Sequence, residues 1–281
     1  MTILDGLQVA QQRNLELRTK IDEHLNKGQR RPHLSIILIG DNPASLSYVK
    51  GKGKACEVAG IKHTLHHLPE STTDDDVRSL IQTLNNDPEV DGMILQLPIP
   101  KHLDENVLID LISKEKDADG FHVMNQGYLY QKKPSIKPAT PKGIMTLLKH
   151  YNIQISGLNA VIVGRSNIVG FPVARLLMDE GATITVCHRQ TKDLRAHTLE
   201  ADLLVVASGK PHLITKDMVK QGAIVVDVGV NRIDGKLIGD VDFEDIKDIA
   251  SFITPVPKGV GPMTINALLE NTYELYLTHI Q

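Results

Sequence analysis

The chain has 281 residues, of which 23% are charged, and its formal net charge is −3. This balance does not favour nucleic acid or an anionic membrane as a partner, because both attract strongly basic surfaces. Its two cysteines, Cys56 and Cys187, lie far apart without metal-ligand spacing, which argues against a disulfide framework and a zinc site and favours the cytoplasm.

In chain order, residues 1–20 contain no apolar run typical of a signal sequence, and no later stretch approaches the roughly 18 apolar residues of a membrane span. Further along, six apolar runs predict buried strands: residues 33–40, 90–96, 159–164, 183–187, 201–207 and 223–229. Helical patterns lie between them. Continuous apolar character is typical of parallel strands covered on both faces, so the predicted fold class is α/β.

Three further segments organise the chain. Residues 130–143 are rich in proline and lysine and indicate a crossing between two domains. Asp234-Gly235 predicts a tight hairpin turn. A last helical pattern follows residues 255–264 and covers residues 265–277.

Residues 47–60 carry three lysines two residues apart, beside a tyrosine. On a helix, Lys52 lies roughly 40° from Tyr48, whereas Lys50 and Lys54 lie roughly 200° and 240° away. Lys52 therefore shares a small, apolar face with Tyr48, and the other two belong to a solvated face. Two interpretations stay open: a lysine whose stem packs while its head reaches water, or a functional lysine in a cleft.

Polar residues also follow predicted strands in this half of the chain. Gln96 ends the run 90–96, and strand carboxyl ends are where sites form in α/β proteins. Asp117 and Asp119 lie in the loop KDADGFH, where an ordinary turn residue is the default interpretation. The three histidines of residues 63–67 lack zinc-helix spacing, so no metal site is predicted.

Residues 160–177 predict a strand, a glycine turn and a helix. The turn runs from Gly164 to Gly170, but the strict dinucleotide pattern fails, because its third position is Ser166 and its last glycine comes one place late. A helix start still offers free N–H groups to a phosphate. A dinucleotide site and an ordinary glycine-rich turn both stay open.

The next predicted strand bears on the choice of cofactor. NAD enzymes place a carboxylate about twenty residues after the loop, whereas His188 and Arg189 stand there, and Arg165 lies in the loop itself. Two arginines suit the 2′-phosphate of NADP through charge-assisted hydrogen bonds. The alternative is that both are solvated surface residues.

Taken together, several segments resemble the bifunctional methylenetetrahydrofolate dehydrogenase/cyclohydrolase family along nearly the whole chain. They are, in the family's order and spacing, DNPASLSYVKGKGKAC, QLPIP, KDADGFH, PATPKGI, GRSNIVGFPVA, CHRQT, DVGVNR, GDVDF and TPVPKGVGPMT. The resemblance implies oxidation of 5,10-methylenetetrahydrofolate to the methenyl form with NADP, and hydrolysis of the methenyl form to 10-formyltetrahydrofolate.

The resemblance also implies an architecture. An N-terminal α/β folate-binding catalytic domain would comprise residues 1–138 and 263–281, with the terminal helix returning to it. A Rossmann-like NADP-binding domain would comprise residues 139–262. Folate would bind in a cleft between the domains, and the enzyme would be a homodimer.

Matching positions in the family motifs imply the site residues. The catalytic set is Ser45, Tyr48, Lys52, Gln96 and Asp119, and folate would also contact Leu97, Pro98, Pro257, Gly259 and Gly261. The cofactor set is Gly164, Arg165, Ser166, Arg189 and Val230. Lys52 is expected to be the acid/base group of hydrolysis, with its pKa lowered toward neutrality. Gln96 would position Lys52, and Asp119 would orient the pterin.

Three positions depart from the family pattern. Ala139 stands where members often have cysteine, and Arg189 where many have serine. Lys258 replaces a glycine, so it carries strain if that position has φ > 0, or else it adds a cationic contact to the folate glutamate tail.

Two rival functions stay open. One is a monofunctional NADP dehydrogenase on a similar frame, and the other is a non-catalytic dinucleotide-binding regulator. Release of 10-formyltetrahydrofolate from the methenyl substrate without cofactor would exclude both.

Overall fold

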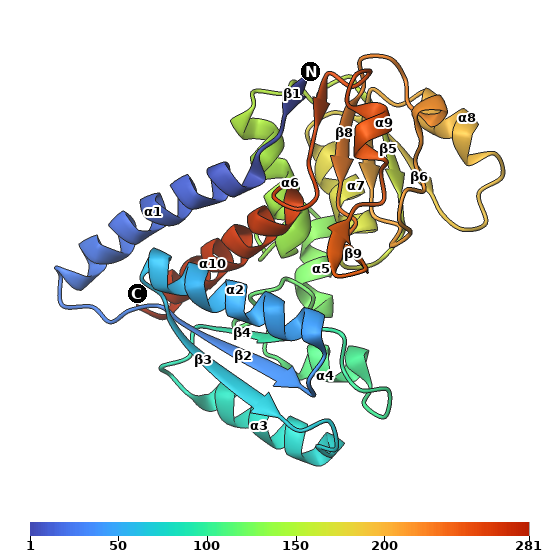
Figure 1. Ribbon diagram of the computed structural model, residues 1–281. Helices are drawn as coiled ribbons and strands as arrows, with labels where there is room; N and C mark the ends of the chain where they lie inside the picture. Colours follow the sequence, from blue (N-terminus) through green and yellow to red (C-terminus); the bar gives the residue numbers. More distant parts are fainter. Residues whose placement is uncertain (281) are drawn as a thin grey trace. The chain divides into compact units, whose positions relative to one another are not determined.

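The computed structural model describes residues 1–280, which form two compact units (Figure 1). Unit 1 comprises residues 1–10 and 140–264, and unit 2 comprises residues 11–139 together with the chain from Ile265 onward. Two long helices, α1 (Gly6–Leu25) and α10 (Val260–His279), each contribute residues to both units. Among residues 1–280, no helix combines the length and apolar character needed to cross a membrane.

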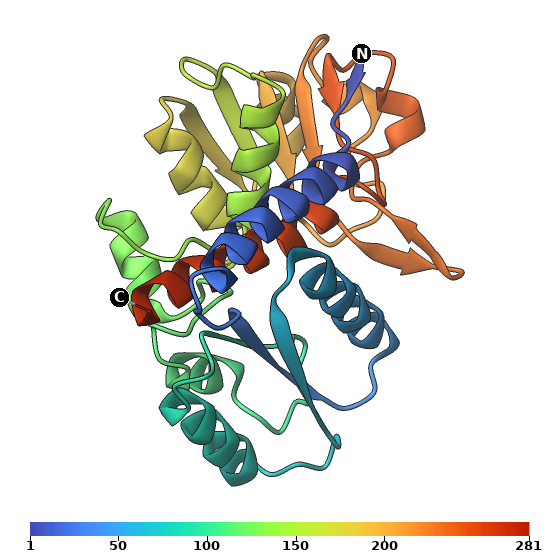
Figure 2. The same cartoon turned by 90° about the vertical axis from the view of Figure 1, so that its left-hand side faces the viewer.

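Unit 2 is built on a three-stranded parallel sheet in the order β3-β2-β4. The strands are β2 (His33–Ile39), β3 (Lys62–Leu68) and β4 (Gly92–Leu95). The helices are α2 (Pro43–Ala59), α3 (Asp74–Asn86), α4 (Glu105–Leu111) and α5 (Val123–Tyr130). In Figure 2, α2 covers one face of this sheet and α3 the other.

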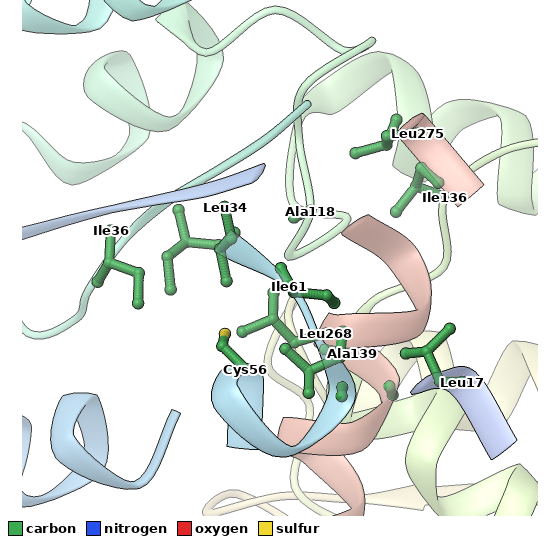
Figure 3. Close-up of a cluster of buried hydrophobic side chains, with 14 of the residues drawn as sticks. Leu17, Leu34, Ile36, Cys56, Ile61, Ala118, Ile136, Ala139, Leu268 and Leu275 are labelled. Carbon is green, nitrogen blue, oxygen red and sulfur yellow. The ribbon is translucent and has the colours of Figure 1, made fainter. Parts of the chain in front are cut away.

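Alternate residues of β2 belong to two different cores, which explains why its sequence is apolar throughout. Leu34 and Ile36 pack in a cluster with residues of α1, α2 and α10 (Figure 3), whereas Ile37 and Ile39 pack with residues of α3 and α4. A strand buried on both faces has no place for polar alternation. The edge strand β3, in contrast, is partly exposed along its length, and its polar sequence KHTLHHL contains no apolar run by which a strand is predicted.

The C-terminal part of α10 packs against α1 within unit 2. The Asn266 amide donates to Oδ1 of Asn14 at 2.9 Å, and Arg13 pairs with Glu270 at 2.7 Å. Leu17 of α1 and Leu268 of α10 lie in one apolar cluster (Figure 3). The predicted return of the terminal helix to the N-terminal part of the chain is therefore confirmed.

Unit 1 contains a six-stranded parallel sheet in the order β1-β11-β8-β7-β5-β6. The strands are β1 (Thr2–Ile3), β5 (Asn159–Val163), β6 (Thr183–Cys187), β7 (Leu203–Val206), β8 (Ile224–Asp227) and β11 (Phe252–Ile253). The helices are α6 (Ala139–His150), α7 (Gly170–Asp179), α8 (Leu194–Leu199) and α9 (Phe243–Ile246), with a 3₁₀ turn at Lys216–Met218.

The predicted hairpin is also present in unit 1, formed by β9 (Asn231–Ile233) and β10 (Lys236–Ile238). Its turn residues Asp234 and Gly235 both have positive φ, of 48° and 79°, as the tightest hairpin turns require. The parallel sheets and intervening helices confirm the predicted α/β class, with a Rossmann-like second part.

Candidate active site and cofactor loop

Helix α2 carries the three lysines, and local chemistry determines where it begins and ends. The Asn42 side chain accepts from the backbone N–H groups of Ala44 and Ser45, and Pro43 follows at the first helical position. At the other end, Gly60 adopts a left-handed conformation with φ of 77° and donates to the last carbonyls. The helix therefore spans the whole predicted stretch.

On this helix, Lys52 is only 5% exposed, whereas Lys50 and Lys54 are exposed. The Lys52 ammonium nitrogen lies 5.8 Å from the centre of the Tyr48 ring, close enough for a cation–π contact. The predicted separation of the lysines onto two faces is confirmed. A buried ammonium needs a polar partner, since burying an unpaired charge is costly.

That partner is Gln96, whose Oε1 accepts from Lys52 Nζ at 3.0 Å. Gln96 stands just past β4, and its backbone N–H donates to Ile37 at 2.8 Å, which extends the sheet ladder by one residue. Its side-chain amide nitrogen donates to the Leu97 carbonyl at 2.7 Å. The bond to the Leu97 carbonyl holds the Gln96 amide in the orientation that presents its oxygen to Lys52.

Asp119 completes this group through its charge. Burial lowers the pKa of Lys52, and the negative charge of Asp119 opposes that effect. Burial also raises the pKa of Asp119 to about 6, against the attraction of Lys52 and with added repulsion from Asp117. For Tyr48, burial and then Asp119 raise the pKa of the phenol. Burial thus disfavours the charged form of both the Lys52 amine and the Asp119 carboxyl.

The other predicted site residues of unit 2 lie on α2 or directly after β4. Ser45 is 3% exposed, and its buried hydroxyl oxygen has no hydrogen-bond partner within residues 1–280. Leu97 is partly buried and Pro98 is exposed, directly after Gln96. Ser45, Tyr48 and Lys52 are three and four residues apart on α2, so they lie on the same face of that helix.

In unit 1, the glycine loop between β5 and α7 is closely packed. Gly164 has φ of 134°, and a Cβ there would lie 2.2 Å from the Ala207 carbonyl oxygen. At Gly170, a Cβ would lie 2.2 Å from the Gly164 carbonyl oxygen. Only glycine fits at either position, so the late second glycine is required by contact between the turn and the start of α7.

Ser166 explains the departure from the strict glycine pattern. Its hydroxyl oxygen accepts from the backbone N–H groups of Val169 and Gly170, at 3.1 and 3.3 Å, and so caps the start of α7. Arg165 and Arg189 are both exposed, after β5 and β6 respectively, and Arg165 reaches Gln190 at 3.4 Å. A tight glycine loop after a buried strand, with two exposed guanidinium groups after β5 and β6, fits a dinucleotide that carries an extra phosphate.

The remaining predicted residues also lie in unit 1. Val230 is 50% exposed, directly before β9, and Pro257 is exposed. A Cβ at Gly259 would lie 2.4 Å from the Pro255 carbonyl oxygen, whereas Gly261, in the first turn of α10, is partly exposed. Lys258 has φ of 85°, in the left-handed region, which is the condition under which strain is expected at this position.

Sequence reasoning missed a pair of buried aspartates that shape the loop before Val230. Asp227 accepts from the backbone N–H groups of Gly229, Asp240 and Val241, at 2.9 to 3.0 Å. Asp240 accepts from Ser208 and from the Gly209 backbone, at 2.6 to 2.9 Å. Burial raises the pKa of Asp227 to about 6. Their position in DVGVNR and GDVDF was the available signal, but no spacing rule relates two residues that meet across a hairpin.

Known proteins resemble this chain closely. A family model for the catalytic domain of tetrahydrofolate dehydrogenase/cyclohydrolase matches residues 4–119, and the model for its NAD(P)-binding domain matches residues 138–280. The bifunctional protein FolD of Acholeplasma laidlawii is 56% identical over 98% of each chain. The FolD structure from Campylobacter jejuni has a TM-score of 0.96 at 49% identity and covers 99% of each chain. The Trypanosoma brucei enzyme, solved with NADP and an inhibitor, has a TM-score of 0.96 at 34% identity, covering 100% of this chain and 99% of that one.

Proposed function

The chain belongs to the tetrahydrofolate dehydrogenase/cyclohydrolase family, and from this premise we propose how its own residues carry out two reactions. The enzyme oxidises 5,10-methylenetetrahydrofolate to the methenyl form with NADP and hydrolyses that product to 10-formyltetrahydrofolate, within one-carbon metabolism. The observation that carries the proposal is the buried Lys52 ammonium held 3.0 Å from Gln96.

Oxidation makes small demands on the protein. The reacting carbon lies between two nitrogens, so loss of hydride yields a resonance-stabilised cation directly, and NADP when bound supplies the hydride acceptor. The protein residues need only fix the pterin and tolerate positive charge. Asp119 does both in this proposal, because its carboxylate binds the pterin and offsets the charge that develops.

Hydrolysis needs a proton acceptor and donor. Water attacks the methenyl carbon, loses a proton, and the ring then opens at a nitrogen, which takes up a proton. Burial lowers the pKa of Lys52, which favours the neutral amine, and in this proposal the neutral amine accepts the proton from water. The same residue, now charged, donates to the departing nitrogen. Gln96 aims Nζ, and Tyr48 packs beside it.

For NADP, we assign binding of the pyrophosphate to the loop of Gly164 and Ser166 before α7, and binding of the 2′-phosphate to Arg165 and Arg189. Val230 is assigned to a backbone contact near the nicotinamide. Their support is the close glycine contacts and the two exposed guanidinium groups described above. Leu97, Pro98, Pro257, Gly259 and Gly261 are assigned to folate on the family motifs.

We further propose that residues 1–138 with 263–281 serve folate binding and catalysis and that residues 139–262 serve NADP binding. The enzyme is proposed to be a homodimer, as the family resemblance implies, which light scattering of the purified protein tests. It is also proposed to act in the cytoplasm, since Cys56 and Cys187 are both free and buried, as suits a reducing compartment.

The function is tested with purified protein and two substrates. Methylenetetrahydrofolate is supplied with NADP or NAD while methenyl absorbance is followed, and methenyltetrahydrofolate is supplied separately without any cofactor. We expect NADP-dependent oxidation and cofactor-independent release of 10-formyltetrahydrofolate. Oxidation without hydrolysis would identify a monofunctional dehydrogenase, and neither activity would identify a binding protein.

A further inference from the structure

The loop that carries Asp119 is pressed closely against a neighbouring segment of unit 2. It is attached to β4 through Met93, whose backbone N–H donates to Lys116 at 2.6 Å and whose carbonyl accepts from Ala118 at 3.3 Å. At Gly120, with φ of 73°, a Cβ would lie only 2.6 Å from the Lys137 carbonyl carbon. The two backbones are in direct contact, so a shift of one moves the other.

Asn271 of α10 joins these two backbones with a single amide group. It is fully buried, and its Nδ2 donates to the Ala118 carbonyl at 2.8 Å and to the Lys137 carbonyl at 2.9 Å. The Asp119 carbonyl, next along the loop, accepts from the Ala139 backbone N–H at 3.1 Å. Asn271 therefore hydrogen-bonds the peptide group immediately before Asp119, although it lies more than one hundred residues away in sequence.

Asp117 forms hydrogen bonds only to nearby residues of the same loop and of the helix that follows it. Its carboxylate accepts from the backbone N–H groups of Gly120, Phe121 and His122 and from the Asn125 amide, at 2.9 to 3.2 Å. These bonds are local and give the loop its own turn. They do not tie it to α10. The loop meets that helix through the two hydrogen bonds of Asn271 and through Ala118, which packs in the apolar cluster that also contains Leu268.

We propose that Asn271 is a positioning residue of the folate site, which sets the location of Asp119 and thereby the orientation of the pterin. This inference rests on the proposed function, in which Asp119 binds the pterin. The Asn271 amide nitrogen donates to both carbonyls, so an apolar replacement leaves the buried Ala118 carbonyl and the partly buried Lys137 carbonyl without this donor, and the loop shifts to satisfy them. A displacement of about 1 Å in a binding group is enough to cost about 10²-fold in rate.

The test compares two buried asparagines of the same helix. Asn271→Leu should raise the KM for methylenetetrahydrofolate about 10- to 100-fold and leave the KM for NADP unchanged. Asn266→Leu is the control, because Asn266 is equally buried on α10 but bonds to Asn14. The control should lower Tm comparably and leave the folate KM unchanged. If Asn271→Leu does not fold, Asn271→Ser replaces it, since a water can then satisfy the carbonyls without fixing the loop.

A double-mutant cycle separates positioning from a general structural effect. Asn271→Leu should have no further effect on folate KM in an Asp119→Ala background, because the group it positions is gone. A wild-type KM in the single variant, or an equal KM increase with and without Asp119, would overturn the inference. If Asp119→Ala alone leaves folate KM unchanged, the assignment of Asp119 to the pterin fails first, and this inference fails with it.

Discussion

The ammonium nitrogen of Lys52 lies 3.0 Å from Oε1 of Gln96, and Gln96 is held in that orientation by its own bond to the Leu97 carbonyl. A neutral acceptor suits this lysine better than a carboxylate would. It orients Nζ but adds no full negative charge, so burial can still lower the pKa of the amine. The pairing therefore aims a proton-transfer group without fixing it in its charged form.

Lys52→Met should fold and lose hydrolysis selectively. Methionine keeps most of the stem's volume, so packing is preserved, whereas hydrolysis loses its acid/base group and should fall about 10²- to 10⁴-fold. The dehydrogenase should fall much less, because hydride transfer passes no proton to the protein. Both half-reactions are assayed on the same preparation. The exposed Lys50→Met and Lys54→Met are controls, and wild-type hydrolysis by Lys52→Met would refute the assignment.

Gln96→Glu should move the pH dependence of hydrolysis upward. A carboxylate beside Nζ favours the charged lysine, so the rising limb of the pH–rate profile should shift by about one to three pH units to higher pH. Gln96→Leu removes the hydrogen bond to Lys52 and adds no charge, so it should lower the rate of hydrolysis without shifting the pH profile. An unshifted profile in Gln96→Glu would show that Lys52 is not the group whose titration limits hydrolysis.

Asp119→Asn should weaken folate binding and yet stabilise the folded protein at neutral pH. Burial raises the pKa of Asp119 to about 6, from an ordinary value near 3.8. The stability that the protonated carboxyl contributes is therefore fully present below pH 3.8 and is lost as the pH rises through 6. The amide does not titrate, so its advantage should be absent at pH 4 and reach about 1–3 kcal/mol at pH 7.5, allowing for partial exposure.

Urea unfolding of both proteins across this pH range checks the Asp119 prediction. Asp234→Asn is a suitable control, because Asp234 is exposed in a hairpin turn that asparagine also fits. A pH-independent difference between Asp119→Asn and wild type would mean that the carboxyl is not perturbed by burial.

Replacing Arg165 and Arg189 by alanine should impair the use of NADP much more than that of NAD. Each charged hydrogen bond to the 2′-phosphate is worth about 1.5–3 kcal/mol, and NAD lacks this phosphate. kcat/KM is measured with both cofactors for the double variant. Lys192→Ala removes a nearby exposed cation and controls for general electrostatic attraction. Equal losses with NADP and NAD would argue against the assignment.

Lys258→Gly should stabilise the protein slightly. A non-glycine residue in the left-handed region costs about 1–2 kcal/mol, and Lys258 has φ of 85°. Glycine removes that cost but loses about 0.5–1 kcal/mol through the greater entropy of the unfolded chain, so the net gain should lie between about 0 and 1.5 kcal/mol. Chemical unfolding measures it. Lys236→Gly, in strand β10 at ordinary φ, should destabilise instead; a loss in both variants would contradict the strain.

Local patterns were sufficient for much of this protein. Helical periodicity separated Lys52 from Lys50 and Lys54, since an angle of about 100° per residue is a property of the helix itself. Continuous apolar runs located β2 and β4 in one sheet and β5 to β8 in the other, and the Asp234-Gly235 pair located the hairpin. The strand β3 was not predicted, because its partly exposed residues are mostly polar and its sequence resembles a loop.

Only the tertiary structure decided how the Asp119 loop is held and how its carboxyl titrates. Asn271 lies 153 residues from Ala118 and 134 from Lys137, and no periodicity or motif links positions so far apart. The raised pKa of Asp119 likewise depends on burial, opposed by the charge of Lys52, 67 residues earlier in the chain. Local sequence encodes the preferences of a helix or a turn, whereas desolvation and long-range hydrogen bonds exist only after the chain has folded.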